Sequence, residues 1–220
     1  MKGKKAEFIV DFSRVKEDKQ KRIHNNFTEL YAWMFTYLQS EANLREKVRA
    51  KHLFRHKLGL PKDAVLTDDL QVHFEHWLLF DYVTVIGSRV FDMFVRGKKN
   101  ELSKQQLEIC GIMMLMHLEP IQIIEKKKNK IMYTPLFETK NKQIEATPYL
   151  FPGKFHEGDL VLSRVLKMGI ENKLIGPSIQ VSPSYYKDVV KRLEKNYAEG
   201  PSVYRRYLKE YGIDMLQYKH

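Results

Sequence analysis

The sequence lacks several features that would narrow its function. It has a single cysteine, Cys110, in 220 residues, so neither an intramolecular disulfide nor a cysteine-rich zinc site can form. It has no run of about 18 apolar residues, which a membrane-spanning helix requires. The N-terminal stretch MKGKKAEFIVDF has no apolar segment of the length found in signal peptides. These absences predict a protein of the reducing cytoplasm that does not enter a membrane.

Motifs that identify common reactions are also missing. The sequence contains neither G-x-x-x-x-G-K-[ST] nor G-x-G-x-x-G, the common phosphate-binding loops. It contains no G-x-S-x-G of the kind that hydrolases use. Cys110 lies in the apolar segment LEICGIMMLMHL, where a thiol is more often a core residue than a nucleophile. We therefore expect a non-enzymatic binding protein with no catalytic residue and no cofactor.

The charge of the chain is unbalanced. There are 38 Lys and Arg residues against 27 Asp and Glu, which gives a net charge of +11. Residues 1–66 include 15 basic and 8 acidic residues, whereas residues 67–118 include 5 basic and 7 acidic residues. Hydrophobic residues still make up 43% of the chain, enough for a sizeable core. The excess charge favours an anionic partner such as nucleic acid or an acidic protein.

The hydrophobic pattern of the first half of the chain is helical. Residues 1–12 are predicted to form a short extended arm, and beyond Arg14 apolar residues recur at intervals of three and four. Ser40 and Thr67 are the predicted N-caps. Five helices are expected, at about residues 14–38, 40–58, 67–83, 88–97 and 103–118.

The hydrophobic period changes near residue 119. Five short segments rich in β-branched or aromatic residues follow, separated by turn residues: PIQIIEKK, KIMYTPLF, QIEATPY, DLVLSRVLKM and LIGPSIQVS. This spacing predicts a small antiparallel module or barrel, and the fourth segment also fits a helix. After Pro183 two helices flank Gly200-Pro201. The predicted class is α+β, with a helical part (1–118), a β-module (119–183) and C-terminal helices (184–220), all of which can share one core.

Two basic clusters are the predicted nucleic-acid contacts. The first lies on the second helix and comprises Arg45, Arg49, Lys51 and Arg55. The second lies in the turn EKKKNK and comprises Lys126, Lys127, Lys128 and Lys130. Basic grooves and loops follow nucleic-acid backbones, but a solvated helix face and edge-protecting lysines explain the same residues. Phe54 and Tyr133 are candidates for stacking on bases, although strand alternation explains Tyr133 equally well.

Besides a catalytic acid–base role for His76 or Asp81, the segment DLQVHFEHWLLFDY has two interpretations. The first is a metal-dependent hydrolase, whose candidate ligands lie on two helices: His52, His56, Asp69, His73 and His76. The spacing matches no established metal motif, so we expect no bound metal. In the second interpretation, the helix is central in the core. Its polar residues His73, His76 and Asp81 are then hydrogen-bonded at the margin.

Residues 70–175 resemble a known group of proteins. The patterns F..WLLFDY, SRVFDMFVRG and LSKQQLEICGIMML precede a GD.V..R element, matched here by Gly158, Asp159, Val161 and Arg164. This order resembles uncharacterised bacterial and phage proteins that often end in a SEC-C zinc motif. The resemblance implies a helical stretch leading into a β-segment, and a bacterial or phage origin. The chain departs from the group because it lacks the cysteines of the SEC-C tail.

A protein-interaction or regulatory module is the alternative to a nucleic-acid-binding protein. It would use aromatic faces on the C-terminal helices, formed by Tyr185, Tyr186, Tyr204 and Tyr207. Such an interaction would depend little on salt, whereas phosphate contacts weaken steeply as salt rises.

Overall fold

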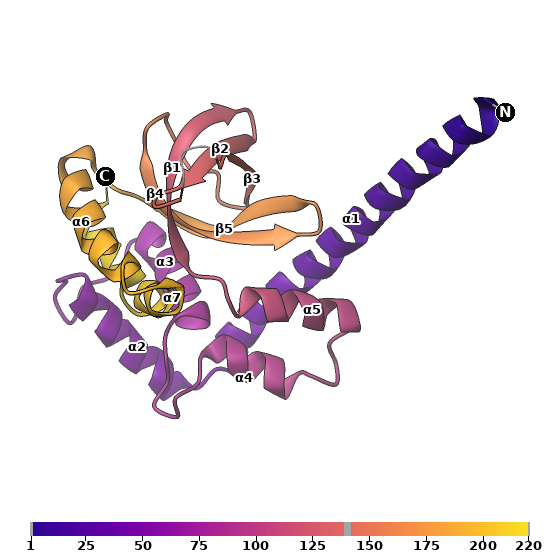
Figure 1. The fold of residues 1–220 in the computed structure, drawn as a ribbon. Coiled ribbons are helices and arrows are strands. Elements are labelled where there is room, and N and C mark those ends of the chain that lie inside the picture. Colours follow the sequence, from indigo (N-terminus) through magenta and orange to yellow (C-terminus); the bar gives the residue numbers. More distant parts are fainter. Residues whose placement is uncertain (1, 139–141, 220) are drawn as a thin grey trace.

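The computed structural model describes residues 2–138 and 142–219, with side chains from residue 12 onward. Helices precede and follow a five-stranded barrel (Figure 1), which confirms the predicted α+β class. The helices are α1 (Lys2–Ser40), α2 (Leu44–Lys57), α3 (Asp68–Phe80), α4 (Val90–Gly97), α5 (Lys104–Met113), α6 (Tyr186–Tyr197) and α7 (Pro201–Tyr211). The strands are β1 (Leu118–Lys127), β2 (Lys130–Pro135), β3 (Ile144–Tyr149), β4 (Leu160–Met168) and β5 (Glu171–Gln180). Two 3₁₀ helices cover Pro183–Tyr185 and Gly212–Tyr218.

The first helix is much longer than expected. α1 begins at Lys2, so the predicted extended arm over residues 1–12 is wrong. Phe8, Phe12 and Val15 are spaced by four and three residues, which is the period of a helix rather than of a strand. With 39 residues, α1 is about 58 Å long at about 1.5 Å per residue. Its N-terminal half projects from the body of the molecule (Figure 1).

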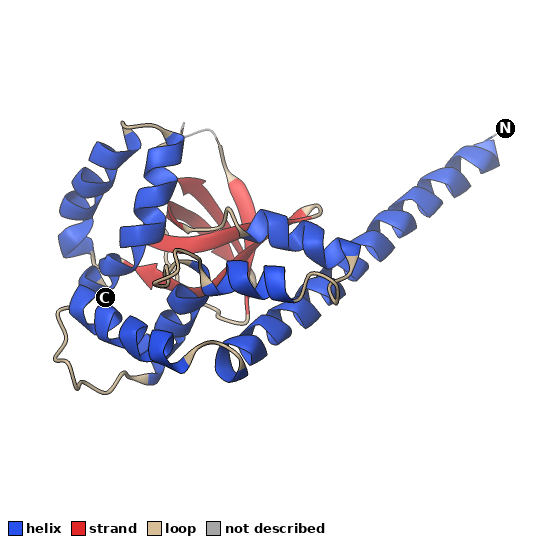
Figure 2. Ribbon diagram, turned by 90° about the horizontal axis from the view of Figure 1, so that it is seen from below, coloured by secondary structure: helices blue, strands red, loops and turns tan. Residues whose placement is uncertain are grey.

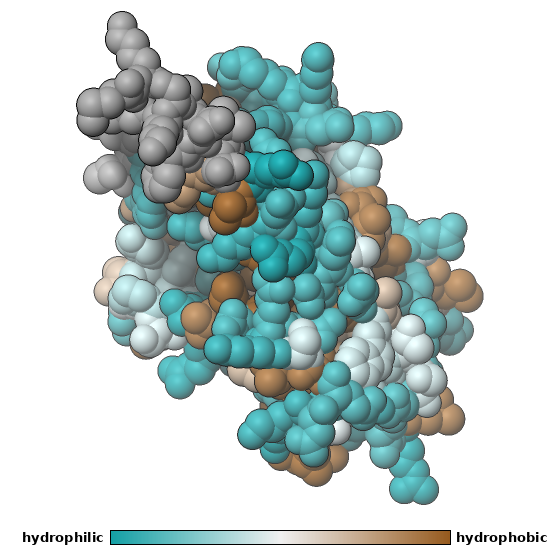
Figure 3. Space-filling model, turned by 90° about the vertical axis from the view of Figure 1, so that its right-hand side faces the viewer, coloured by the Kyte–Doolittle hydropathy of each residue, from teal (hydrophilic) through white to brown (hydrophobic). Residues whose placement is uncertain are grey.

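The projecting part of α1 is solvated. Figure 3 faces the side from which it extends, and the described surface there is mainly hydrophilic, with hydrophobic residues in separate groups. Side chains 12–19 are all exposed. The helix meets the barrel at Gln20, whose Nε2 donates to the carbonyl of Met168 at 3.0 Å. Its Oε1 accepts the N–H of Ile170 at 3.2 Å.

Side-chain caps explain several helix starts. Thr67 accepts an N–H group from the first turn of α3, as predicted. Ser103 accepts one from the first turn of α5. Ser40 is wrong as the cap of α2, because it is the last residue of α1. Asn43 caps α2 instead, and its side chain accepts the N–H groups of Arg45 and Glu46.

All five predicted β segments are strands, including the fourth, which also fitted a helix. The barrel closes in the order β1-β2-β3-β5-β4, with β1 paired to β4. Four pairs are antiparallel and β3–β5 is parallel, so the predicted barrel is antiparallel except at that pair. The parallel pairing of β3 with β5 arises because residues 150–159 lead the chain from β3 to β4, which lies beside β1. Leu118 already opens β1, so α5 ends at Met113 rather than near residue 118.

Two hydrophobic clusters form the interior. The smaller cluster fills the barrel and includes Ile121, Tyr133 and Val161. The larger cluster contains residues of the N-terminal helices, the barrel and the C-terminal helices, for example Phe27, Leu162 and Leu208. Figure 2, seen from below, shows helices lying across the strands. The three predicted parts of the chain therefore contribute to one common core.

Gly176 allows β5 to approach α3 closely. Its φ is +73°, and a Cβ atom at this position would lie 2.3 Å from Cδ2 of His76. The imidazole of His76 is held in place, because Nε2 lies 2.6 Å from the hydroxyl of Tyr31 and Nδ1 lies 2.8 Å from the carbonyl of Val72. A side chain on residue 176 therefore has no room.

Gly176→Ala should destabilise the protein more than Gly59→Ala. Gly59 has a φ of +66° and open space around its Cβ position, so its substitution adds backbone strain alone, about 1–2 kcal/mol. Gly176→Ala adds overlap with a buried side chain, which typically costs about 1–3 kcal/mol more. Urea unfolding of both variants measures the difference, and equal losses would contradict the close approach.

Candidate anion-binding face

Helix α2 lies beside the C-terminal elements and forms a cationic surface with them. Nζ of Lys57, at the end of α2, lies 3.0 Å from the carbonyl oxygen of Glu210 and 3.0 Å from a carboxylate oxygen of Asp214. α2 has six Lys and Arg residues and one Glu, and α7 has three Lys and Arg residues and one Glu. We call the surface formed by α2, α7 and residues 81–89 the cationic face.

A pocket of about 550 Å³ opens in the cationic face. It is lined by Leu53, Lys57, Trp77, Asp81, Tyr82, Val83, Arg89, Arg206, Lys209 and Glu210. The volume lies within the range of about 300–1,000 Å³ that is typical of small-ligand sites. Four cations, two carboxylates and two aromatic side chains suit an anionic ligand that carries a flat or apolar group.

A buried ion pair lies next to the pocket. Nη2 of Arg164, in β4, donates to Oδ2 of Asp81, and the two side chains are 1% and 2% exposed. Oδ1 of Asp81 is buried and has no hydrogen-bond partner among the described residues. Since Asp81 also lines the pocket, its carboxylate places a negative charge among the surrounding cations.

Lys209 is the most perturbed cation of the pocket. Burial, assisted by the nearby guanidinium of Arg89, lowers the pKa of Lys209 to about 8. Its ammonium donates to the carbonyl of Met114 at 2.6 Å. A bound anion would stabilise the charged form and raise this pKa again.

The predicted contacts of α2 have different roles. Arg45 and Arg49 are exposed, whereas Lys51 and Arg55 are partly buried. Nε of Arg55 donates to the carbonyl of Ala64 at 2.8 Å and so holds the loop between α2 and α3. Arg49 lies close enough to the phenol of Tyr82 to lower its pKa, against the larger effects of burial and Glu46 that raise it. Arg49 therefore lies near Tyr82, which is one of the lining residues of the pocket.

The hairpin lysines lie far from the cationic face. In Figure 1 the β1–β2 end of the barrel is at the top and α2 is at the bottom, so the two predicted clusters are not brought together. Lys128 occupies the turn with a φ of 50°. The other three lysines have local partners: Lys126 with the carbonyl of Gly153, Lys127 with Glu125, and Lys130 with Glu145.

The aromatic residues of the site were not those predicted. Phe54 and Tyr133 are 0% and 1% exposed, so neither can stack on a base in this structure. Trp77 and Tyr82 contribute to the wall of the pocket, but they are 2% and 3% exposed, so they cannot stack on a base in this structure either. Both belong to the segment DLQVHFEHWLLFDY, and the missed cations of α7 belong to SVYRRYLKEY. The adjacent Arg205 and Arg206 mark a basic site in the sequence, but their position beside α2 depends on the fold.

The tyrosines of the C-terminal helices are largely engaged within the protein. Tyr204 is only 8% exposed, whereas Tyr185 is 43% exposed. The hydroxyl of Tyr186 accepts the N–H of Leu160 at 3.0 Å, and that of Tyr207 accepts Nε of Arg192 at 2.7 Å. A continuous exposed aromatic face, as the protein-interaction alternative required, is not formed by these four residues.

The two histidines of α3 are core residues. Both ring nitrogens of His76 have partners, Tyr31 and a backbone carbonyl of α3. His73 is equally buried, but neither of its nitrogens has a partner among the described residues, so the prediction of hydrogen-bonded residues at the helix margin is wrong for it. His52 and His56 are exposed on α2. Within the described part of the chain, no three His, Cys, Asp or Glu residues converge as metal ligands.

Comparisons with known proteins add no relative. No family model matches the sequence, and neither the curated proteins nor the solved structures include a significant match. The resemblance of residues 70–175 to SEC-C-associated proteins therefore stays a prediction. In residues 2–138 and 142–219, no helix has both the length and the apolar character needed to traverse a lipid bilayer.

Breaking the buried ion pair should be costly, and replacing both partners should not. Asp81→Leu leaves Arg164 buried without a counter-charge, which typically costs about 3–5 kcal/mol. Asp81→Leu combined with Arg164→Met should recover most of this loss, because apolar replacements of buried pairs are often neutral. The exposed pair Lys130–Glu145 provides the control, since Glu145→Ala should cost less than about 1 kcal/mol. In urea unfolding, a double variant no more stable than Asp81→Leu would contradict this account.

The buried histidines should make the protein sensitive to acid. Burial lowers the pKa of His73 and His76 to about 3, against about 6.5 in an unfolded chain. Between these values the unfolded state binds more protons, so the free energy of unfolding falls as the pH drops from about 6.5 towards 3.

His73→Leu tests this sensitivity, because it also removes a buried group without partners. At pH 7 its free energy of unfolding should equal or exceed that of the wild type. At pH 5 the advantage should grow by about 1–2 kcal/mol, measured by urea unfolding. The exposed His52→Leu is the control and should keep the wild-type profile. If the free energy of unfolding of His73→Leu falls between pH 7 and pH 5 as much as that of the wild type, groups other than His73 cause the sensitivity to acid.

Proposed function

We propose that this protein binds nucleic acid in the cytoplasm, without catalysis, through the cationic face. Arg45 and Arg49 contact phosphates, and the adjoining pocket receives one nucleotide. The observation that carries the proposal is the convergence of the α2 and α7 cations around a pocket of about 550 Å³ that also contains Trp77 and Tyr82.

The chemistry of the face fits a single strand better than a regular duplex. Lys and Arg side chains along a helix neutralise phosphates and release counterions, which supplies affinity without sequence preference. Bases of a single strand are free to leave the stack and enter a pocket, whose wall here includes the edges of Trp77 and Tyr82. A duplex keeps its bases paired, so it offers the pocket no ring to bind.

The barrel supports a secondary contact. Its strand order is similar to that of Greek-key barrels of the OB type, in which the β1–β2 and β4–β5 loops bind oligonucleotides. Lys126, Lys127, Lys128 and Lys130 belong to the β1–β2 hairpin. This support is an analogy at the level of the fold. Since three of these lysines already have local partners, we assign the hairpin the weaker role.

Charge reversal on the cationic face should weaken binding more than the same reversal on the hairpin. Arg45→Glu/Arg49→Glu and Lys127→Glu/Lys128→Glu each change the net charge by the same amount, at opposite ends of the molecule. We expect the first variant to lose about tenfold or more in affinity for a labelled single-stranded oligonucleotide, and the second to lose less. Fluorescence anisotropy at about 50 and 200 mM salt measures both losses and the salt dependence.

The outcomes separate the alternatives. Equal losses in the two variants would mean that net charge, not the cationic face, drives association. Tighter binding to duplex than to single strands would contradict the role of the pocket. Weak binding to DNA and RNA alike at low salt would overturn the proposal and favour a protein partner.

A further inference from the structure

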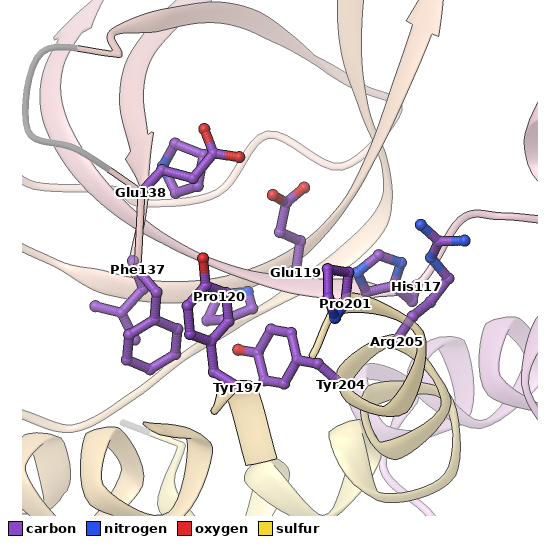
Figure 4. Close-up of a pocket in the computed structure, with 11 residues that line it drawn as sticks. His117, Glu119, Pro120, Phe137, Glu138, Tyr197, Pro201, Tyr204 and Arg205 are labelled. Atoms are coloured by element: carbon purple, nitrogen blue, oxygen red, sulfur yellow. The ribbon is translucent and has the colours of Figure 1, made fainter. Parts of the chain in front are cut away.

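A second pocket lies between the barrel and the C-terminal helices. It is formed by the start of β1, the end of β2 and the connection between α6 and α7, and its volume is about 210 Å³ (Figure 4). It shares no lining residue with the pocket of the cationic face. Its volume is below the range of about 300–1,000 Å³ that is typical of sites for drug-sized ligands, so it suits a smaller molecule.

Three aromatic rings form one side of this pocket. The rings of Phe137 and Tyr197 are stacked at 4.8 Å, and Tyr204 meets Tyr197 edge-on at 5.2 Å. In Figure 4 the rings lie together on one side, and the carboxylates of Glu119 and Glu138 lie on the other. Aromatic faces next to carboxylates are the surroundings that attract organic cations.

Two polar groups of the pocket have no partner among the described residues. Tyr204 is 8% exposed, and its buried hydroxyl has no hydrogen-bond partner within the described residues. In Figure 4 this hydroxyl points towards Tyr197, into the ring of lining side chains. Glu119 forms no ion pair with any described residue, whereas Glu138 pairs with Lys142 at 2.5 Å. Burial and the charge of Glu138 raise the pKa of Glu119, so a cation beside it would relieve an unfavourable charge.

The lining excludes the other simple ligands. Hard metal ions such as Ca²⁺ take about six to eight oxygen ligands, whereas this pocket is lined largely by aromatic, proline and leucine side chains. An anion would have to approach Glu119 and Glu138, with Arg205 as the one lining Lys or Arg residue. A small cation with an apolar surface satisfies both the rings and the carboxylate.

We propose that this pocket binds a small organic ammonium ion, with Glu119 as its counter-ion and the faces of Phe137 and Tyr197 as its cation–π partners. The hydroxyl of Tyr204 accepts a hydrogen bond where the ligand has an N–H group. The site does not depend on the proposed nucleic-acid binding, since none of its residues belongs to the pocket of the cationic face.

Isothermal titration calorimetry of the full chain tests this site. The probes are choline, ethanolamine and 3,3-dimethylbutan-1-ol, the uncharged isostere of choline, in phosphate buffer free of amines. We expect saturable binding of at least one ammonium probe, about tenfold or more tighter than that of the isostere, since cation–π and ionic contacts together exceed about 1.4 kcal/mol. No saturable binding of either ammonium probe, or equal affinity for the isostere, would overturn the proposal.

Variants assign the binding to this pocket. Glu119→Gln should weaken binding about tenfold or more by the same reasoning, and Glu108→Gln, an exposed change on α5, should leave it unchanged. Tyr197→Leu keeps the charges and removes one ring, so it provides an independent loss if Glu119→Gln folds poorly. Circular dichroism establishes that each variant is folded. Wild-type affinity in folded Glu119→Gln or Tyr197→Leu would place the ligand elsewhere.

Discussion

The buried ion pair between Asp81 and Arg164 constrains the arrangement of the whole molecule. Asp81 follows the last turn of α3, and Arg164 lies in β4, so the pair joins the helical part to the barrel. Each charge is tolerable away from water only in the presence of the other. α3 therefore cannot shift along β4 without leaving both uncompensated. Because Asp81 also lines the pocket of the cationic face, a side chain of the barrel influences the charge of a pocket that helices form.

A second set of contacts holds α3 from the other direction. Tyr31 of α1 meets His76, and Gly176 of β5 lies against the same imidazole. Seven of the 13 residues of α3 are buried, and two of the seven are histidines that must remain neutral inside the core. Such polar groups favour one packing over alternatives, because any rearrangement leaves more of them without partners. Neither ring nitrogen of His73 has a partner in the part of the chain that the structure describes, so this helix is not optimised for stability alone.

Local signals account for what the sequence predicted well. Caps such as Thr67, and β-branched runs between turns, act over a few residues and are readable without a fold. The prediction of an extended arm over residues 1–12 is wrong. A short apolar run fits the period of a strand or of a helix, whereas the longer spacing of Phe8, Phe12 and Val15 fits only a helix. The parallel pairing of β3 with β5 is set by where β4 lies, which no local pattern encodes. The α2 cluster and Arg206 are separated by more than half of the chain, so only packing brings them together.

The two pockets differ in charge, and the net charge of the chain acts on them in opposite ways. A charge of +11 draws anions towards the cationic face and repels cations from Glu119. Added salt screens both effects. Binding at the cationic face must therefore weaken as salt rises, whereas an ammonium ion in the aromatic pocket loses a repulsion and keeps its short-range contacts, which are less screened because they are partly buried. Ionic strength thus separates the two sites within one protein, even though α7 contributes side chains to both.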